Sequence, residues 1–419
     1  MNFADDLSAE QRQQYIRICE KYHLPTVTTF IRNISNEKLN LAHCGIGQRA
    51  LRGIAYTLKQ NIEIVDLDLS DNNLGRESAA TMGEVLRTNY FLKSLNLSCN
   101  HIADEGVRIL FSAIEEGDCL EILNLSDNGI SKKSADPLRQ VLSNATSLKE
   151  LYLSKNNLTE AICRDIRNGL ENNSNLEVLD LSWNKLRGDC CSHVAMGITN
   201  TSLKTLNLAW NGCGDKVAVA LGTSLLTNTS LLELNLDHNN ISSDGFKEIA
   251  EALRMNKSLC TLRIQNNITD GAGLQALLDA CVENELSALT TIDFSRGWIS
   301  EQNDFAIKKL ISRNPSFSLL HEGQVRTIKR LDESAIRLEL FTAMKHYILR
   351  NRLRSVDVFS KWDDNENSFI SREEFIQSIH ACMPVRLHRF KIDLLLSWLD
   401  KHNTGYINYR EFLRIVRQY

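Results

Sequence analysis

Pairs of leucines recur along this chain at a nearly fixed spacing. The two leucines of a pair are separated by one residue, and asparagine follows three residues after the second leucine, in the pattern LxLxxN. The pattern starts at Leu67, Leu95, Leu123, Leu151, Leu179, Leu206, Leu234 and Leu262. Successive copies are 28 residues apart, except for one step of 27 residues after Leu179. Divergent copies at Leu39 (LNLAHC) and Ile292 (IDFSRG) bring the number to about ten, which predicts a repeat architecture.

Each copy predicts one strand and one helix. The leucines alternate with mainly polar residues, as in a short strand with one buried face. The stretch after the strand carries apolar residues at helical spacing, for example Val107, Leu110, Phe111 and Ile114. We expect the asparagine to turn its amide inward and satisfy backbone groups of the tight bend.

One such unit cannot bury its own leucines, so the units must stack into a solenoid. Strands stack about 4.8 Å apart whereas helices need about 10 Å, so the array must curve with its strands on the concave side. These residues match the leucine-rich repeat, and the 28-residue form resembles the ribonuclease-inhibitor-like class over about residues 30–315. The resemblance implies an α/β solenoid shaped like a horseshoe and a protein-binding role. One branch of that class activates small GTPases.

Two windows near the C-terminus have a different pattern. DDNENSFISREE at 363–374 and DKHNTGYINYRE at 400–411 each begin with Asp, end with Glu and have Ile at the eighth position. Amphipathic helical sequence surrounds both. This is the layout of an all-α EF-hand pair, in which the two eighth residues pair in a short ladder.

The calcium ligands of these windows are incomplete. The first would use Asp363, Asn365, Asn367, the Phe369 carbonyl and Glu374, and the second Asp400, Thr404, the Tyr406 carbonyl and Glu411. Ser368 replaces the usual glycine of the first loop, and His402 occupies a ligand position of the second. We expect the first loop to be the better calcium site. The alternative is a degenerate pair that serves as a helical packing module.

These patterns divide the chain into four parts. We expect an N-terminal helical cap at 1–30, the solenoid at 31–315, a linker at 316–334 and the EF-hand pair at 335–419. The combination resembles the leucine-rich-repeat-containing protein 74 group, which implies an intracellular adaptor. The expected location is the cytoplasm, with a ciliary or cytoskeletal association as one option.

Charge and cysteine content narrow the possible functions. The net charge is −4, which argues against nucleic acid as a partner. From residue 323 onward the chain has 17 Lys and Arg against 12 Asp and Glu, so calcium could regulate how a basic module meets an acidic solenoid. The eleven cysteines show no paired spacing apart from Cys190 and Cys191, and no signal peptide or apolar run of membrane-spanning length is visible. We therefore expect a reduced intracellular protein without disulfides, and no special role for that cysteine pair.

The sequence does not indicate an enzyme, because it contains no HExxH, CxxC, GxSxG or glycine-rich phosphate loop. The residues expected on the concave face are mainly small and polar. The exceptions, which we predict to bind a protein partner, are Tyr152, Lys155, Trp183, Trp210, His238 and Arg263. Alternatively, the two tryptophans fold over the corner after each strand and only cover the edge of the solenoid. We expect a monomer. Activation of a small GTPase through the repeat edge is the second functional hypothesis.

Overall fold

The computed structural model describes residues 3–199, 201–268, 271–294, 301–321 and 324–326, together with 362, 369–371, 374–375, 378, 399 and 406–408. The chain divides into two compact units, Met1–Leu310 and Ile311–Tyr419. Each unit is described by itself.

The first unit begins with two helices and then repeats one strand and one helix along the chain, and its last helix, Glu301–Arg313, runs across the boundary after Leu310. Its elements are α1 (Phe3–Lys21), α2 (Thr28–Asn33), β1 (Lys38–Asn40), α3 (Gln48–Leu58), β2 (Asp66–Asp68), α4 (Glu77–Thr88), β3 (Ser94–Asn96), α5 (Ala103–Gly117), β4 (Ile122–Asn124), η1 (Lys132–Ser134), α6 (Ala135–Asn144), β5 (Glu150–Tyr152), η2 (Glu160–Ile162), α7 (Cys163–Glu171), β6 (Val178–Asp180), α8 (Gly188–Gly197), β7 (Thr205–Asn207), α9 (Asp215–Leu225), β8 (Glu233–Asn235), α10 (Ser243–Leu253), β9 (Thr261–Arg263), α11 (Gly271–Glu283), β10 (Thr291–Asp293) and α12 (Glu301–Arg313).

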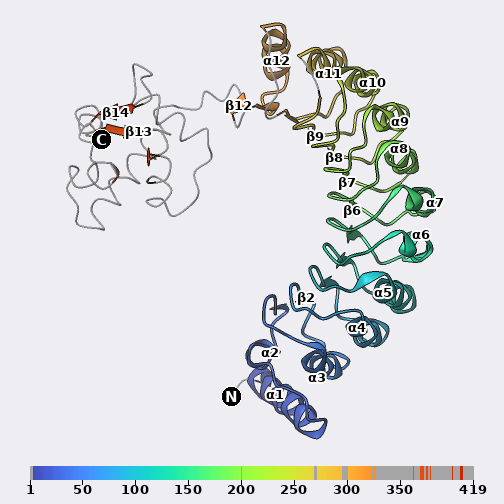
Figure 1. The fold of residues 1–419 in the computed structure, drawn as a ribbon, viewed down its shortest axis with the longest axis vertical. Helices are drawn as coiled ribbons and strands as arrows, with labels where there is room; N and C mark the ends of the chain where they lie inside the picture. The colour runs from blue at the N-terminus through green and yellow to red at the C-terminus, as the bar shows by residue number, and fades with distance from the viewer. Residues whose placement is uncertain are drawn as a thin grey trace. The chain divides into compact units, whose positions relative to one another are not determined.

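The strands β1 to β10 follow one another in chain order in a parallel sheet. Each is three residues long, and the central leucines of neighbouring strands stand opposite one another, as Leu95 and Leu123 do. These leucines are fully buried. Every predicted copy has its strand, including the divergent copies at Leu39 and Ile292. Figure 1 shows the strands on the inner side of the arc and the helices on the outer side, so the predicted α/β solenoid is confirmed.

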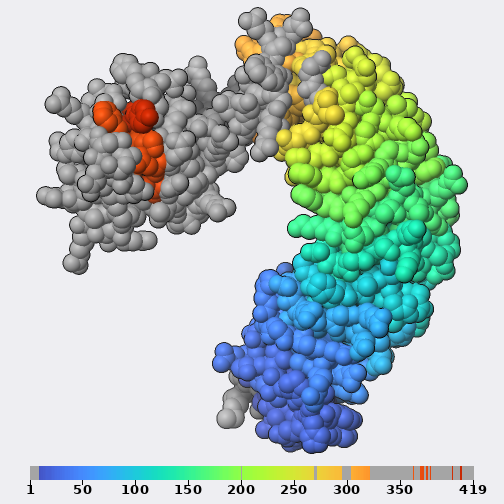
Figure 2. Space-filling model, viewed as in Figure 1, coloured from blue at the N-terminus to red at the C-terminus, as the bar shows by residue number. Residues whose placement is uncertain are grey.

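The helices bury the apolar face that their sequence predicts. In α5, Val107, Leu110, Phe111 and Ile114 are all buried. Because neighbouring helices present the same face, each repeat covers the leucines of the next. In the space-filling view the side chains of successive repeats meet along the arc (Figure 2).

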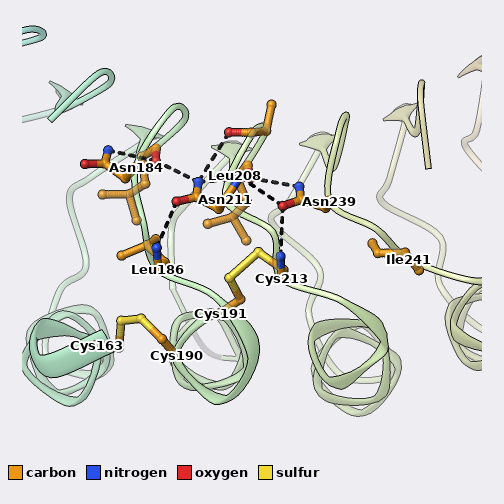
Figure 3. The surroundings of a disulfide bond; sticks show 12 residues. Cys163, Asn184, Leu186, Cys190, Cys191, Leu208, Asn211, Cys213, Asn239 and Ile241 are labelled. Carbon is orange, nitrogen blue, oxygen red and sulfur yellow. Dashed lines mark hydrogen bonds between the residues drawn. A yellow bond between two sulfur atoms is a disulfide. The ribbon is translucent and has the colours of Figure 1, made fainter. Parts of the chain in front are cut away.

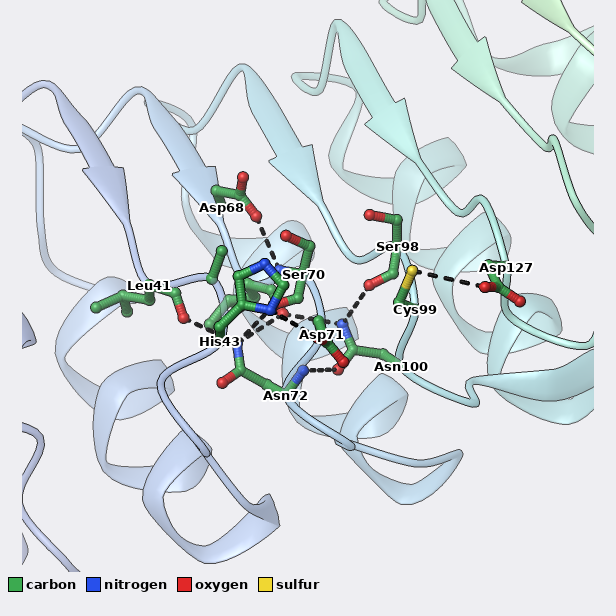
Figure 4. A network of polar contacts seen from close by, with 12 residues as sticks. Leu41, His43, Asp68, Ser70, Asp71, Asn72, Ser98, Cys99, Asn100 and Asp127 are labelled. Atoms are coloured by element: carbon green, nitrogen blue, oxygen red, sulfur yellow. Dashed lines mark hydrogen bonds and ion pairs between the residues drawn. The ribbon is translucent and has the colours of Figure 1, made fainter. Parts of the chain in front are cut away.

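A ladder of buried asparagines connects the repeats. Asn100 donates from Nδ2 to the carbonyls of Leu69 and Leu97, at 2.9 and 3.1 Å, and its Oδ1 accepts from the Asn72 N–H at 3.0 Å. Figure 4 shows Asn72 and Asn100 in this arrangement. The inward amide that the sequence predicts is therefore confirmed, and it joins each repeat to its neighbours.

A second set of asparagines, not predicted above, follows the helices. Asn89 donates to the carbonyls of Leu58 and Asn61, and its Oδ1 accepts from the Phe91 and Leu92 N–H groups at 2.8 and 2.9 Å. The other members of this set are Asn61, Asn173, Asn228, Asn256 and Asn284. Their recurrence 22 residues after the first leucine of a repeat is visible in the sequence.

The described residues of the second unit include two short antiparallel pairs. The pair β11 (Ser318–His321) and β12 (Gln324–Arg326) lies within residues 316–334, so the predicted linker contains strands. The other pair, β13 (Phe369–Ser371) and β14 (Tyr406–Asn408), places Ile370 opposite Ile407. This matches the ladder expected between the two calcium-loop windows.

Two disulfides correct the sequence-based expectation. Cys163 is joined to Cys190 and Cys191 to Cys213, with Cα–Cα distances of 5.2 and 5.5 Å (Figure 3). The prediction of a chain without disulfides was therefore wrong for these four cysteines. The partners lie 27 and 22 residues apart, in adjacent repeats. Stacking the repeats brings them together, so no local spacing motif reveals the pairing.

Candidate partner-binding site

One residue in each of nine repeats adopts the left-handed backbone conformation, immediately after the buried strand segment. We call this residue the corner residue. The corner residues are His43, Asp71, Cys99, Asp127, Lys155, Trp183, Trp210, His238 and Asn266, with φ between 52° and 59°. In eight of these repeats the next residue is the ladder asparagine, and in the first it is Cys44.

Hydrogen bonds hold this conformation on both sides of the corner. The Trp183 N–H donates to the Ala209 carbonyl at 2.8 Å, and the Trp210 N–H donates to the Asp237 carbonyl at 2.9 Å. The next residue, Asn184, donates from Nδ2 to the Leu181 carbonyl at 3.0 Å. The backbone therefore turns here whatever side chain the corner carries.

The left-handed conformation costs most residues about 1–2 kcal/mol, while asparagine and aspartate tolerate it best. Asp71, Asp127 and Asn266 therefore suit their positions. Trp183 and Trp210 do not, so the backbone gives no reason for tryptophan at two successive corners. Another property of these side chains must account for them.

The two indoles and one imidazole form a stack, which we call the aromatic corner: Trp183, Trp210 and His238. The indole centroids are 4.1 Å apart with an interplanar angle of 16°, and the Trp210 and His238 rings are 3.5 Å apart at the same angle. Trp183 is 48% exposed and Trp210 40%. The tryptophans are therefore not buried beneath the adjoining loops.

Lys155 occupies the corner that precedes Trp183 in the repeat order. Its side chain is exposed. Among the described residues, no carboxylate lies within ion-pair distance of its ammonium group. The predicted residues Lys155, Trp183, Trp210 and His238 thus lie on four successive corners of the solenoid.

Tyr152 and Arg263 lie instead on the concave strands β5 and β9. At the same strand position in most other repeats, an Asn or Asp Oδ1 accepts a hydrogen bond from the N–H two residues later. These residues are Asn40, Asp68, Asn96, Asn124, Asp180, Asn207 and Asn235. The small polar residues expected to form a free surface therefore accept hydrogen bonds from the backbone. Tyr152 and Arg263 occupy this strand position without that role.

The Tyr152 hydroxyl donates to Glu150 Oε2 at 2.6 Å. Burial and this carboxylate raise the pKa of Tyr152 well above its ordinary value. The phenol therefore stays protonated and half-buried. It forms part of the concave floor and not of the aromatic corner.

Asp237 is a concave residue that the sequence pattern did not single out. Its Oδ1 accepts from the Gln265 N–H at 2.6 Å. In most other repeats an Asn or Asp two residues earlier accepts this bond, but Arg263 has no acceptor atom in its side chain. Burial raises the pKa of Asp237 to about 6, and the Asp293 carboxylate adds to this shift while Arg263 opposes it. The C-terminal part of the concave face thus contains a carboxylate with a pKa of about 6.

The structure describes three of the predicted calcium ligands. Phe369 and Tyr406 lie on β13 and β14, and Glu374 Oε2 accepts from the Ser371 N–H at 2.8 Å. Trp362, Ile370, Phe375, Leu399 and Ile407 are buried. The remaining predicted ligands lie outside the described residues: Asp363, Asn365, Asn367, Asp400, Thr404 and Glu411.

Comparison with protein families agrees with the repeat geometry. A model described as Leucine Rich repeat matches residues 88–110, 119–138, 172–189, 199–222 and 227–250, and a second, Leucine Rich Repeat, matches 147–168. The chain is a leucine-rich repeat protein. The matches name the repeat type, while the ribonuclease-inhibitor-like subtype and the EF-hand pair stay predictions.

Solved structures are similar over parts of this leucine-rich repeat protein. Leiomodin-1 Actin-Binding Site 2 (ABS2) is 26% identical over 30% of this chain and 73% of that one, with a TM-score of 0.27. A TLR13–ssRNA13 complex is 20% identical over 64% of this chain and 37% of the other, with a TM-score of 0.40. Neither likeness identifies a function. A search of curated protein sequences found no match.

No helix in the described part of the chain is long and apolar enough to cross a membrane.

Proposed function

We propose that this protein is a binding scaffold that holds a protein partner on the concave side of the solenoid, with the aromatic corner as the anchor. Leucine-rich repeat proteins typically act as non-enzymatic scaffolds for protein–protein interaction. The observation that supports the proposal here is the pair of stacked, exposed tryptophans at corners where tryptophan is unfavourable for the backbone. Exposed aromatic side chains beside a cation are enriched in the residues that dominate binding energy.

The location of the aromatic corner supports its role as an anchor. Ring stacking between repeats fixes the indoles before a partner arrives, so little side-chain freedom is lost on binding. Lys155 adds a charge at one end of the stack, and Arg263 adds one on the concave strands. The partner would therefore contact the corners of several successive repeats at once.

The test compares the wild type with the double variant Trp183→Asn and Trp210→Asn. Asparagine suits the left-handed backbone, so the variant removes the rings without adding strain. Proteins captured by each form are identified by quantitative mass spectrometry, and the affinity of the best candidate is measured with purified components. We expect the double variant to weaken binding by about 30-fold or more.

Tyr90→Ala is the matched control, because Tyr90 is 63% exposed but lies away from the corners. It should bind the same partner as the wild type does. Equal binding by the tryptophan variant would contradict the proposed anchor. Unchanged GTP hydrolysis by a panel of small GTPases in single-turnover assays would remove the second hypothesis, GTPase activation.

We further propose that the C-terminal windows form a calcium-binding EF-hand pair that modulates this scaffold. The pairing of Ile370 with Ile407 and the buried contact between Trp362 and Phe375 support the proposal. Calorimetric titration with calcium tests it, with Glu374→Gln and Glu411→Gln as variants. The stronger effect is expected from Glu374→Gln. Absence of calcium-dependent heat in the wild type would refute calcium binding and leave a packing module.

A further inference from the structure

The disulfide between Cys163 and Cys190 lies beside an open pocket. Cys163 is the first residue of α7, and Cys190 is the third residue of α8. Figure 3 shows the pair between these helices. Both sulfurs therefore lie in the first turn of a helix, where the positive end of the helix dipole stabilises a thiolate.

The pocket has a volume of about 540 Å³, and Cys190 forms part of its lining. Its charged lining comprises Glu160, Arg164, Arg187, Asp189 and Lys216. Lys216 is paired with Asp189 at 2.6 Å. Of the remaining three, two are cationic and one is anionic, and the N-terminal ends of α7 and α8 add partial positive charge.

The second disulfide provides an internal comparison. Cys191 and Cys213 do not line this pocket. All four sulfur-bearing side chains are at most 2% exposed, so burial alone does not distinguish the two disulfides. Proximity to a cationic pocket distinguishes them, because Cys190 lines the pocket and Cys191 does not. It gives a small reagent a way to approach Cys190 that it does not give for Cys191.

We propose that this pocket is an exchange site for a small anionic thiol of the glutathione class, which reversibly opens and closes the Cys163–Cys190 disulfide. The arginines would hold the carboxylates of the incoming thiol while its sulfur reaches Cys190. This inference is independent of the proposed partner binding.

The exchange balances in two steps. The thiolate of the first molecule attacks Sγ of Cys190, the disulfide bond breaks, and the Cys163 thiolate leaves and takes a proton from water. The thiolate of a second molecule then attacks the sulfur of the first small thiol in the mixed disulfide. Cys190 leaves as a thiolate and is protonated, and the oxidised small disulfide is released. Two electrons pass from two small thiols to the protein, and the reverse reaction closes the disulfide.

The consequence lies in the repeat that carries Trp183. Both disulfides include a cysteine of α8, so this repeat is tied on one side to the repeat of β5 and on the other to that of β7. Opening the Cys163–Cys190 disulfide releases only the first connection. The small thiol would therefore alter the bracing of one repeat and leave the other disulfide intact.

The test follows both disulfides in the full-length protein by timed alkylation and mass spectrometry. Three thiols are compared: glutathione (anionic), 2-mercaptoethanol (neutral) and cysteamine (cationic). The rate at Cys163–Cys190 is divided by the rate at Cys191–Cys213 for each thiol, which cancels the intrinsic reactivity of the reagent. We expect this ratio to be about fivefold higher for glutathione than for 2-mercaptoethanol at low salt, lower still for cysteamine, and to converge at high salt.

The variant Arg164→Gln with Arg187→Gln should remove the advantage of glutathione. Arg108→Gln with Arg167→Gln is the matched control, because these two arginines do not line the pocket and should leave the ratio unchanged. Equal ratios for the three thiols would overturn the proposal. Recovery of Cys163 and Cys190 as free thiols after incubation with oxidised glutathione would also overturn it. The melting temperature of each variant confirms that it is folded.

Discussion

The corner residues of the N-terminal repeats and those of the central repeats share a backbone but carry different chemistry. Near the N-terminus, His43 Nδ1 lies 2.6 Å from Asp71 Oδ2, and Cys99 Sγ lies 3.7 Å from Asp127 Oδ2 (Figure 4). In the central repeats the same positions carry the aromatic corner. The repeat therefore fixes the backbone conformation and leaves the corner side chain free to specialise.

The two regions also differ in covalent bracing. The central repeats contain both disulfides, whereas the N-terminal Cys44 and Cys99 are free and exposed. The disulfide between Cys191 and Cys213 joins the repeat of Trp183 to the repeat of Trp210. The stacked rings and the cross-links thus occur in the same repeats, and variants can separate what is common to both regions from what is local.

The largest effect should come from the ladder that both regions share. Asn100→Ala and Asn184→Ala each remove an amide that donates to three buried or half-buried carbonyls. We expect each variant to lose about 3–4 kcal/mol of unfolding free energy, because several buried backbone groups lose their partners. Urea unfolding under reducing conditions measures both losses. A difference of more than about 2 kcal/mol between them would contradict the shared role.

The second effect should be restricted to the central repeats. Cys191→Ala with Cys213→Ala removes the cross-link, and we expect a loss of about 3 kcal/mol under oxidising conditions because the unfolded chain gains freedom. In excess dithiothreitol the variant and wild type should differ by less than about 1 kcal/mol. Cys99→Ala is the N-terminal control and should change little in either condition. An equal loss with and without dithiothreitol would mean that packing, and not the disulfide, stabilises this region.

The third effect distinguishes the concave surface near the aromatic corner from the concave surface of the N-terminal repeats. The N-terminal repeats have Ser70 and Ser98 where the later repeat has Asp237. Because the folded pKa of Asp237 is raised from 3.8 to about 6, the folded state binds the proton more tightly, and stability decreases as pH rises from about 4 to 6. Asp237→Asn should remove this decrease and gain about 1–2 kcal/mol at pH 7.

Asp68→Asn is the control for this prediction, since Asp68 Oδ1 accepts one backbone hydrogen bond that an amide oxygen can also accept. Chemical unfolding at pH 4, 5, 6 and 7 compares the two variants with the wild type. A stability profile of Asp237→Asn that runs parallel to that of the wild type would show that this carboxylate does not titrate in the expected range.

The sequence predicted the solenoid because its main cause, leucine at fixed positions, is local and repeated. The same register located Trp183 and Trp210 at equivalent positions. It could not show that this position is left-handed, because residues as different as Asp71, Cys99 and Lys155 occupy it. It also missed the disulfides and the Asp237–Gln265 bond, since each joins residues of adjacent repeats that only stacking brings together.

The smallest effect on stability is the most informative about function. Trp183→Asn loses a ring contact worth about 1 kcal/mol but relieves a similar backbone strain, so we expect a net change within about 0.5 kcal/mol. The reciprocal change in the N-terminal region, Asp127→Trp, should cost about 1 kcal/mol because it adds the strain without a neighbouring ring. Thermal and urea unfolding measure both variants. A loss above about 2 kcal/mol for Trp183→Asn would mean that the indole is a structural cover. A neutral result together with lost partner binding would mean that the aromatic corner exists for recognition.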